Sequence, residues 1–297
     1  MAVDIESAER AGVLPRRPSA TRNLLAGSAR WMSVRHCLPA EALLVVGLYA
    51  AYDLGRGAAL TGTGVAVAHA RSVYHLEQAL HLAVEGPIQH ASLAVPGLTV
   101  TFGLGYLALH ILLTGAVLLW LYWRHPDGYV VLRNALLVAS ILALVGFVVW
   151  PTAPPRLAGI GIAGTLSQAG VALNSPTLTL LYNPYAAFPS LHEAYAAITA
   201  YGIRRHAPNR LVWAVGAVLP VWVAVEVIAT GNHFVVDVVA GVMVAELGLL
   251  AARRFATAPS AGGPSAQRNP ANRSSSGSAA PLLSATRTNH SRSNSRL

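Results

Sequence analysis

The sequence contains no lysine, a single cysteine and few charged residues. All 21 basic residues are arginine, and charged residues make up 11% of the 297 positions, whereas a soluble domain averages about 25%. The lone Cys37 excludes an internal disulfide and matches no metal or redox spacing. Hydrophobic residues reach 54%, and this composition indicates that lipid is the main solvent of the chain.

Acidic residues are also scarce, which leaves a formal net charge of +9. Such a balance raises the possibility of nucleic-acid binding. The arginines, however, stand at the ends of apolar runs and in two polar tails, where orientation in a membrane explains them. We therefore expect no nucleic-acid partner.

Six apolar segments reach or approach the roughly 20 residues that a helix needs to cross a bilayer. They span residues 38–54, 95–123, 130–150, 188–203, 211–230 and 233–252. The predicted fold class is therefore all-α, a polytopic bundle of six transmembrane helices. The fourth segment is short and carries Glu193, so it requires protein around it.

Composition divides the chain into three parts. Residues 1–36 form a basic tail without a long apolar run, so we expect no cleavable signal peptide, and residues 37–256 form the transmembrane domain. Residues 257–297 are rich in Ser, Asn, Pro, Gly and Arg and have no acidic residue, which predicts a disordered basic tail.

Arginine placement predicts the orientation, because arginine-rich loops stay in the cytoplasm. With both termini inside, the inner ends carry Arg124, Arg133, Arg204, Arg205, Arg210, Arg253 and Arg254. The outer segments carry only Arg56, Arg71 and Arg156. We expect a multi-pass protein of the plasma membrane, in which Arg156 is an arginine that orientation does not explain.

The outer stretch 62–93 has apolar residues at helical spacing, which predicts an amphipathic helix in the outer interface and a break at Gly86-Pro87. The apolar positions are Ala70, Val73, Leu76, Leu80 and Val84. Its histidines, His69, His75 and His81, are six apart and so do not share one helix face. We expect no metal and no other cofactor.

His233 and Asp237 are the first candidate site residues. They stand four apart at the start of an apolar helix, so their side chains lie on one face, and the carboxylate can hold the imidazole in one tautomer. The alternative is a polar pair that only marks a helix end. Ionisable residues in membrane domains are costly and usually functional, which favours a site. Asn232, next to His233, is a candidate substrate-binding residue.

The second candidate segment lies at the start of the fourth predicted helix, and the third candidate segment follows the third predicted helix. Ser190 and Glu193 resemble a capping box, which leaves a helix N-terminus able to attract a phosphate, with His192 as a proton donor beside it. Arg156, after a proline-rich exit, can clamp phosphate. Alternatively Ser190 only caps, His192 only fills space and Arg156 binds a lipid headgroup. The topology brings all three segments to the outer membrane face, which favours a metal-free phosphoryl-transfer site.

These residues resemble the three-part signature of the type 2 phosphatidic acid phosphatase (PAP2) superfamily. The matching residues are Arg156, Pro189-Ser190-x-His192 and His233-x3-Asp237, in that order. The companion stretches Asn183-Pro184-Tyr185-Ala186-Ala187-Phe188 and Ala153-Pro154-Pro155-Arg156 resemble its inositol phosphorylceramide synthase-like branch. The similarity covers the six-helix core and not the tails.

The resemblance implies a covalent mechanism. His233 would attack phosphorus to form a phosphohistidine, Asp237 would orient it, and His192 would protonate the departing oxygen and then activate water or an alcohol. Arg156 would hold the phosphate, with Ser190 and Asn232 also expected to contact substrate. The implied partners are a membrane lipid phosphate and an acceptor alcohol; the oligomeric state stays open.

The sequence departs from the wider superfamily at two cation positions. Val149 stands where the usual first motif has a lysine, and Glu226 and Val227 stand where the third motif has Ser-Arg. One arginine remains for the phosphate, which suits a phosphodiester better than a dianionic monoester. Transferase and phosphatase remain alternatives, as does a non-catalytic lipid transporter or scramblase. His110 and Tyr106, one turn apart, either line a headgroup cavity or form hydrogen bonds within the bundle, and we favour the second.

Overall fold

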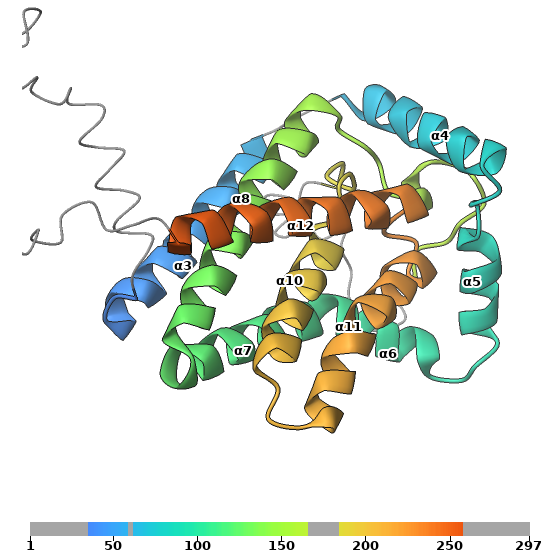
Figure 1. The fold of residues 1–297 in the computed structure, drawn as a ribbon. Coiled ribbons are helices and arrows are strands. Elements are labelled where there is room, and N and C mark those ends of the chain that lie inside the picture. Colours follow the sequence, from blue (N-terminus) through green and yellow to red (C-terminus); the bar gives the residue numbers. More distant parts are fainter. Residues whose placement is uncertain (1–34, 59–61, 166–183, 258–297) are drawn as a thin grey trace, which may run out of the picture. The chain divides into compact units, whose positions relative to one another are not determined.

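The structure is a computed structural model that describes residues 35–58, 62–165 and 184–257 (Figure 1). These residues belong to one unit, Met1–Pro259, and they fold into helices with one isolated β-bridge between Thr152 and Ala186. Most of the two predicted tails lies outside the described residues. The all-α prediction is confirmed for the described part of the chain.

Every segment predicted to cross the membrane contains a helix. The long helices are α3 (Leu38–Ala58), α7 (His110–Arg124), α8 (Pro126–Val149), α10 (Leu191–His206), α11 (Arg210–Ala229) and α12 (Val235–Thr257). The π-helix η1 (Gly105–Leu109) joins α6 (Leu98–Leu104) to α7. Two further helices, α4 (Thr63–Ala79) and α5 (Glu85–Leu93), precede α6, and the short 3-10 helix η2 (Pro155–Leu157) follows α8.

Local chemistry sets several helix ends. Ser190 caps α10 by accepting a hydrogen bond from the Glu193 amide, and Asn209 caps α11 by accepting one from the Val212 amide. The proline of α8, Pro126, stands in its first turn, where the missing N–H costs nothing. Because α10 ends at His206 and Asn209 already caps α11, a short turn joins these two helices and makes them antiparallel neighbours.

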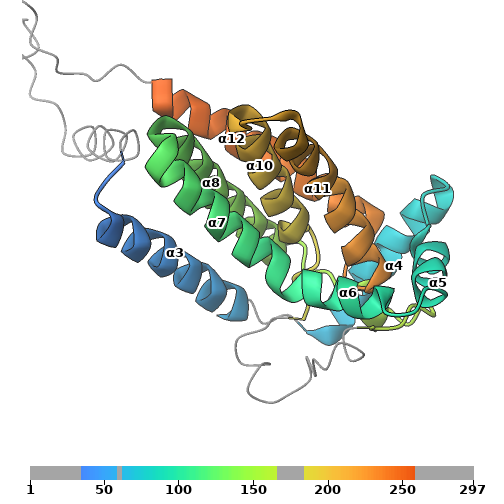
Figure 2. The same ribbon diagram turned by 90° about the horizontal axis from the view of Figure 1, so that it is seen from below.

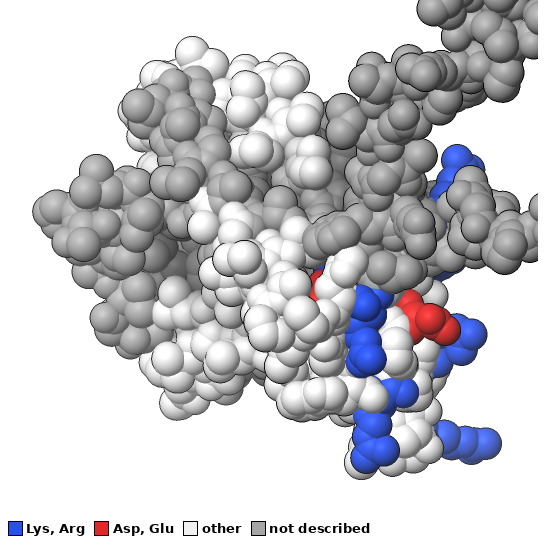
Figure 3. Space-filling model, turned by 90° about the vertical axis from the view of Figure 1, so that its left-hand side faces the viewer, with Lys and Arg blue, Asp and Glu red and all other residues white. Residues whose placement is uncertain are grey.

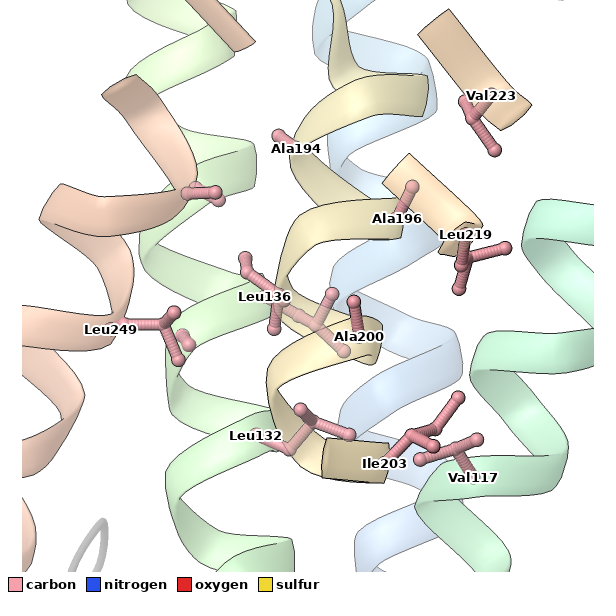
Figure 4. Packing of buried hydrophobic residues seen from close by; sticks show 14 of the residues in the cluster. Val117, Leu132, Leu136, Ala194, Ala196, Ala200, Ile203, Leu219, Val223 and Leu249 are labelled. Atoms are coloured by element: carbon pink, nitrogen blue, oxygen red, sulfur yellow. The ribbon is translucent and has the colours of Figure 1, made fainter. Parts of the chain in front are cut away.

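The centre of the bundle is α10, the shortest of the long helices apart from α7. It packs against α7, α8, α11 and α12, which surround it in two orthogonal views (Figures 1 and 2). Its small residues Ala194, Ala196 and Ala200 are buried in the same apolar cluster as Leu132 and Leu219 of the neighbouring helices (Figure 4). Small side chains let helices approach closely, so the segment that hydropathy alone supports least is held by its neighbours.

Polar side chains add hydrogen bonds between helices. The hydroxyls of Thr114 and Thr199 lie 2.9 Å apart and join α7 to α10, and the hydroxyls of Ser140 and Tyr195 lie 2.7 Å apart and join α8 to α10. Such bonds are worth roughly 0.6 to 2 kcal/mol each in a membrane. They fix α10 in rotation as well as in position.

The apolar surface identifies a membrane protein. Three helices are long and apolar enough to cross a bilayer: Pro126–Val149, Arg210–Ala229 and Val235–Arg254. A fourth candidate, Glu85–Leu93 with Leu98–Ala108, is bent by 114°. By this criterion the count in the described residues is three or four, so six spans remain a prediction. In the view of Figure 3 most of the charged side chains lie together at the lower right of the picture, and the rest of the described surface in that view is largely uncharged.

The outer amphipathic stretch differs from the prediction in two ways. The break that we predicted at Gly86-Pro87 lies earlier, at residues 80–84, where His81 has φ 58°. The Gly86-Pro87 pair stands in the first turn of α5. The inward face of α4 carries Ala66, Ala70, Val73 and Glu77, whereas Leu76 and Leu80 are about half exposed. In an interfacial helix the apolar side can face lipid, so these exposed leucines are compatible with the predicted place of this stretch in the outer interface.

Candidate active site

Main-chain hydrogen bonds bring the three predicted site segments together. The Thr152 amide donates to the Tyr185 carbonyl at 2.9 Å, and the Ala187 amide donates to the Thr152 carbonyl at 3.1 Å. The first segment is thereby paired with the stretch that leads into the second. Asn183, the first residue of that companion stretch, lies outside the described residues.

Two further bonds attach the third segment. The Ser190 amide donates to the Asp237 carbonyl at 3.0 Å, and the Arg156 amide donates to the Gly231 carbonyl at 3.1 Å. Gly231 has φ 70°, and a Cβ there would lie 2.6 Å from the Ala163 carbonyl oxygen, so glycine suits this position. The convergence expected from topology is what the structure shows.

His233 is buried, and its proton is placed by a main-chain group. Its Nδ1 lies 2.9 Å from the Ala187 carbonyl oxygen, which can only accept, so Nδ1 carries a hydrogen. The lone pair of the neutral ring is then on Nε2. Asp237 Oδ2 lies 3.4 Å from the same Nδ1 and accepts a 2.9 Å bond from the Phe234 amide. From the sequence we expected Asp237 to set the tautomer of His233. The carbonyl of Ala187, for which the sequence suggested no such role, makes the shorter contact with Nδ1, and Asp237 makes the longer one.

His192 stands in the first turn of α10 against two aromatic rings and near the other histidine. Its ring centroid is 5.7 Å from that of His233. It stacks on Tyr106 at 4.1 Å and meets His110 edge-on at 4.2 Å. For His110 we favoured a hydrogen bond within the bundle, and its ring forms one with the backbone of Tyr106. The rings of Tyr106 and His110 also both lie against His192.

Arg156 is held in place by Asn232. Its Nη1 donates to Asn232 Oδ1 at 2.6 Å, and Asn232 Nδ2 donates to Thr230 Oγ1 at 2.8 Å. Asn232 is 2% exposed and uses its side-chain oxygen for the arginine. Its position supports a role in orienting Arg156, whereas we had expected it to contact substrate.

Ser190 forms half of the predicted capping box. Its Oγ accepts a hydrogen bond from the Glu193 amide at 3.3 Å, as expected. Its own amide, which the box would join to the Glu193 carboxylate, donates to Asp237 instead. Ser190 is fully buried, so its side chain serves the start of α10.

The positions of the missing superfamily cations hold no substitute. Val149 is 71% exposed, and Val227 is fully buried and accepts the amides of Asn232 and His233 at its carbonyl. Glu226 accepts a hydrogen bond from Trp222 Nε1 at 3.0 Å. Arg156 is thus the cation that these three motifs bring to the site.

Two glutamates that the sequence did not single out bind the start of α12. The Val236 amide donates to Glu77 Oε1 at 2.7 Å, and the Val235 amide donates to Glu85 Oε1 at 3.2 Å. The residue before this helix, Phe234, has no capping oxygen of its own. A helix start without a capping side chain indicates, from sequence alone, that its free amides need hydrogen-bond acceptors from other parts of the chain.

The predicted absence of a metal concerned three outer histidines. His69 Nδ1 lies 2.8 Å from the Pro151 carbonyl oxygen, and its ring stacks on Trp150, whereas His75 pairs with Gln78. Within residues 35–58, 62–165 and 184–257 no group of three or more His, Cys, Asp or Glu side chains is arranged to hold a metal ion.

Comparison with known protein families identifies the superfamily of the chain. The model of the PAP2 superfamily matches residues 71–251, a range that contains every candidate site residue. No curated protein matches the chain significantly, and neither does any solved structure.

Proposed function

The chain belongs to the PAP2 superfamily, whose chemistry is that of phosphatases and phosphotransferases, and we propose that it transfers the phosphoryl headgroup of a membrane lipid through a phosphohistidine. The observation that carries this proposal is the state of His233. The Ala187 carbonyl fixes the hydrogen on Nδ1 and leaves Nε2 as the nucleophile, with His192 nearby.

The first step forms a bond between His233 Nε2 and phosphorus and breaks the bond to the leaving oxygen. Cationic His192 gives its proton to that oxygen, so the departing group leaves as an alcohol. Near-attack contacts are about 3–3.5 Å. Ring centroids 5.7 Å apart therefore support a single phosphorus within reach of both histidines.

The second step reverses these roles. Neutral His192 takes a proton from the acceptor hydroxyl, whose oxygen attacks phosphorus while the P–N bond breaks and His233 is released. Buried Asp237 balances the charge that His233 carries while phosphorylated. Arg156, oriented by Asn232, binds the phosphate oxygens.

The charge of the site favours a phosphodiester substrate and transfer to an alcohol. The motifs supply one arginine where the wider superfamily has additional cations, and a diester brings one negative charge where a monoester brings two. This agrees with the resemblance to the inositol phosphorylceramide synthase-like branch. The proposed substrates are thus a phospholipid donor with a diester headgroup and an acceptor alcohol.

A lipid panel tests the reaction. Purified full-length protein in detergent is incubated with lipid phosphates and diester phospholipids, with and without acceptor alcohols and in the presence of EDTA, and the products are analysed by mass spectrometry. New phospholipids without free phosphate support transfer, and His233→Ala is the control. Free phosphate from monoesters alone would replace transferase with phosphatase, and loss of turnover in EDTA that zinc or magnesium restores would overturn the metal-free mechanism.

We further propose that six helices span the plasma membrane, with both termini in the cytoplasm and the site at the outer leaflet. The exposed arginines at the inner ends of α7, α10, α11 and α12 support this orientation. A reporter fused after Arg254 should be cytoplasmic, and one inserted near Ser167, outside the described residues, should be external. An internal Ser167 reporter would move the chemistry to the other leaflet.

A further inference from the structure

The first turn of α12 follows directly after His233 in the sequence. Its main-chain amides at Val235 and Val236 donate hydrogen bonds to buried carboxyl groups of other helices. Glu77 reaches it from α4 and Glu85 from α5, each through Oε1. Both side chains are almost fully buried, at 0% and 1% exposure. A helix N-terminus attracts anions, so this arrangement is favourable for one negative charge.

Two negative charges at this place would repel each other. The second oxygens of both groups, Oε2 of Glu77 and Oε2 of Glu85, are buried and receive no hydrogen bond from a donor in the described residues. A proton on one Oε2 that is donated to the other satisfies both atoms and removes one charge. The side chains of Glu77 and Glu85 lie within hydrogen-bonding reach of each other, as in paired carboxyl groups that share a proton.

The electrostatics agree with such a pair. Burial, reinforced by the neighbouring carboxyl of Glu85 and the charge of Asp237, raises the pKa of Glu77 from 4.5 to about 9, against the opposing effect of the Val236 amide. This helix, α4, is not among the candidate membrane spans. The arginine of α4, Arg71, is turned to the Ala158 carbonyl, to which its Nε donates.

We propose that Glu77 and Glu85 are positioning residues that share one proton and hold the start of α12, and with it His233, in the geometry of the site. Their effect on turnover rests on the proposed function, whereas the shared proton does not. With Asp237 also bonded to the Phe234 amide, three carboxyl groups from three helices satisfy three successive amides of this turn.

The pair makes stability depend on pH with a defined sign. The folded protein keeps a proton on Glu77 up to a pH of about 9, and the unfolded chain releases it above about 4.5. The stabilisation is complete below the lower value and is lost as pH rises through the upper one. Above that pH the two carboxylates repel, and the first turn of α12 loosens.

The substitutions Glu77→Gln, Glu85→Gln and the double change test the pair. Either single change keeps one charge and a donor between the two side chains, so turnover and melting temperature at neutral pH should stay within about threefold and a few degrees of wild type. The double change removes the charge and should lower turnover at least about tenfold. Exposed Glu246→Gln, on α12, is the matched control.

Two readouts separate this proposal from the proposed function. From about pH 6 to about pH 10 the melting temperature of wild type and Glu246→Gln should fall, and that of each single variant should fall less. Infrared spectra of wild-type protein at neutral pH should show a buried protonated carboxyl band that Glu77→Gln lacks. These hold even if no lipid is turned over. Absence of the band in wild type, or a single variant with the pH profile of wild type, would overturn the shared proton.

Discussion

The amide of Ser190 donates to the carbonyl of Asp237 over 3.0 Å, and this bond joins the start of α10 to the first turn of α12. Each residue belongs to a different sequence motif. Because the contact is between main-chain atoms, its geometry depends on how closely the two helices approach. The site is therefore sensitive to residues at that approach which do no chemistry.

Gly241, one turn after Asp237, is such a residue. A Cβ at this position would lie 2.3 Å from the Ser190 carbonyl oxygen, which is main chain and cannot rotate away. Gly241→Ala should destabilise the protein by about 1–3 kcal/mol and reduce phosphoenzyme formation. Thermal unfolding in detergent measures the first effect. Gly115→Ala on α7, with nothing within 4 Å of its Cβ, is the control and should be neutral or stabilising.

The two histidines should fail at different steps when each is replaced by alanine. His233→Ala should form no covalent intermediate with a radiolabelled activated phosphate ester. His192→Ala should still form phosphoenzyme from a good leaving group, while turnover of a poor one falls by about 10²–10⁴-fold. Acid-quenched gels distinguish them, and the label should be acid-labile and base-stable. Persistence of the label in His233→Ala with its loss in His192→Ala would reverse the two roles.

Tyr106 should support His192 through its ring and not through its hydroxyl. The rings stack at 4.1 Å with an angle of 19° between their planes. Tyr106→Leu removes a stacking contact worth about 0.5–1.5 kcal/mol, which predicts up to about a tenfold loss in the proton-transfer step. Tyr106→Phe keeps the ring and should stay close to wild type in steady-state turnover. Equal losses in both variants would point to the hydroxyl instead.

At the other end of the bundle, α3 is tied to α8 by a buried ion pair. Arg133 Nη1 lies 2.6 Å from Glu41 Oε1, both side chains are 1% exposed, and the Tyr129 hydroxyl donates to Glu41 Oε2. Glu41→Leu alone should cost about 3–5 kcal/mol because it leaves a buried cation, as should Arg133→Leu.

The double change Glu41→Leu with Arg133→Leu should recover much of that loss, since neither charge remains. Melting temperatures of the four proteins in detergent give the coupling between the two residues directly. A double variant whose loss equals the sum of the single losses would show that the pair does not interact in this way.

Apolar segments and the order of short motifs were enough to predict the helices and the convergence of the three segments that carry Arg156, His192 and His233. Long apolar segments leave few choices of structure in a membrane, because every backbone group must be satisfied within a helix. The roles of these residues stay predictions. The number of spans was harder, since α7 and α10 are shorter than the 18 residues of a length criterion and the bent α5–α6 pair meets it only as one broken span.

The inward face of α4 could not be read from hydrophobicity. Leu76 and Leu80 are more apolar than the buried Glu77, and in water they would mark the core. At a lipid interface apolar residues can be stable on the exposed face of a helix. Glu77 faces inward because the first turn of α12, more than 150 residues later in the sequence, has amides that need an acceptor. Only the tertiary structure shows that Val236 is its partner.

The bond from His233 to Ala187 has a consequence for mutagenesis. The accepting atom is a peptide oxygen, which every amino acid carries, so replacing the Ala187 methyl group leaves the acceptor in place. A substitution scan can score this position as tolerant although one of its atoms decides which nitrogen of the histidine is protonated. Replacing the peptide link after Ala187 by an ester, which weakens the carbonyl as an acceptor without altering any side chain, would expose a dependence that codon changes conceal.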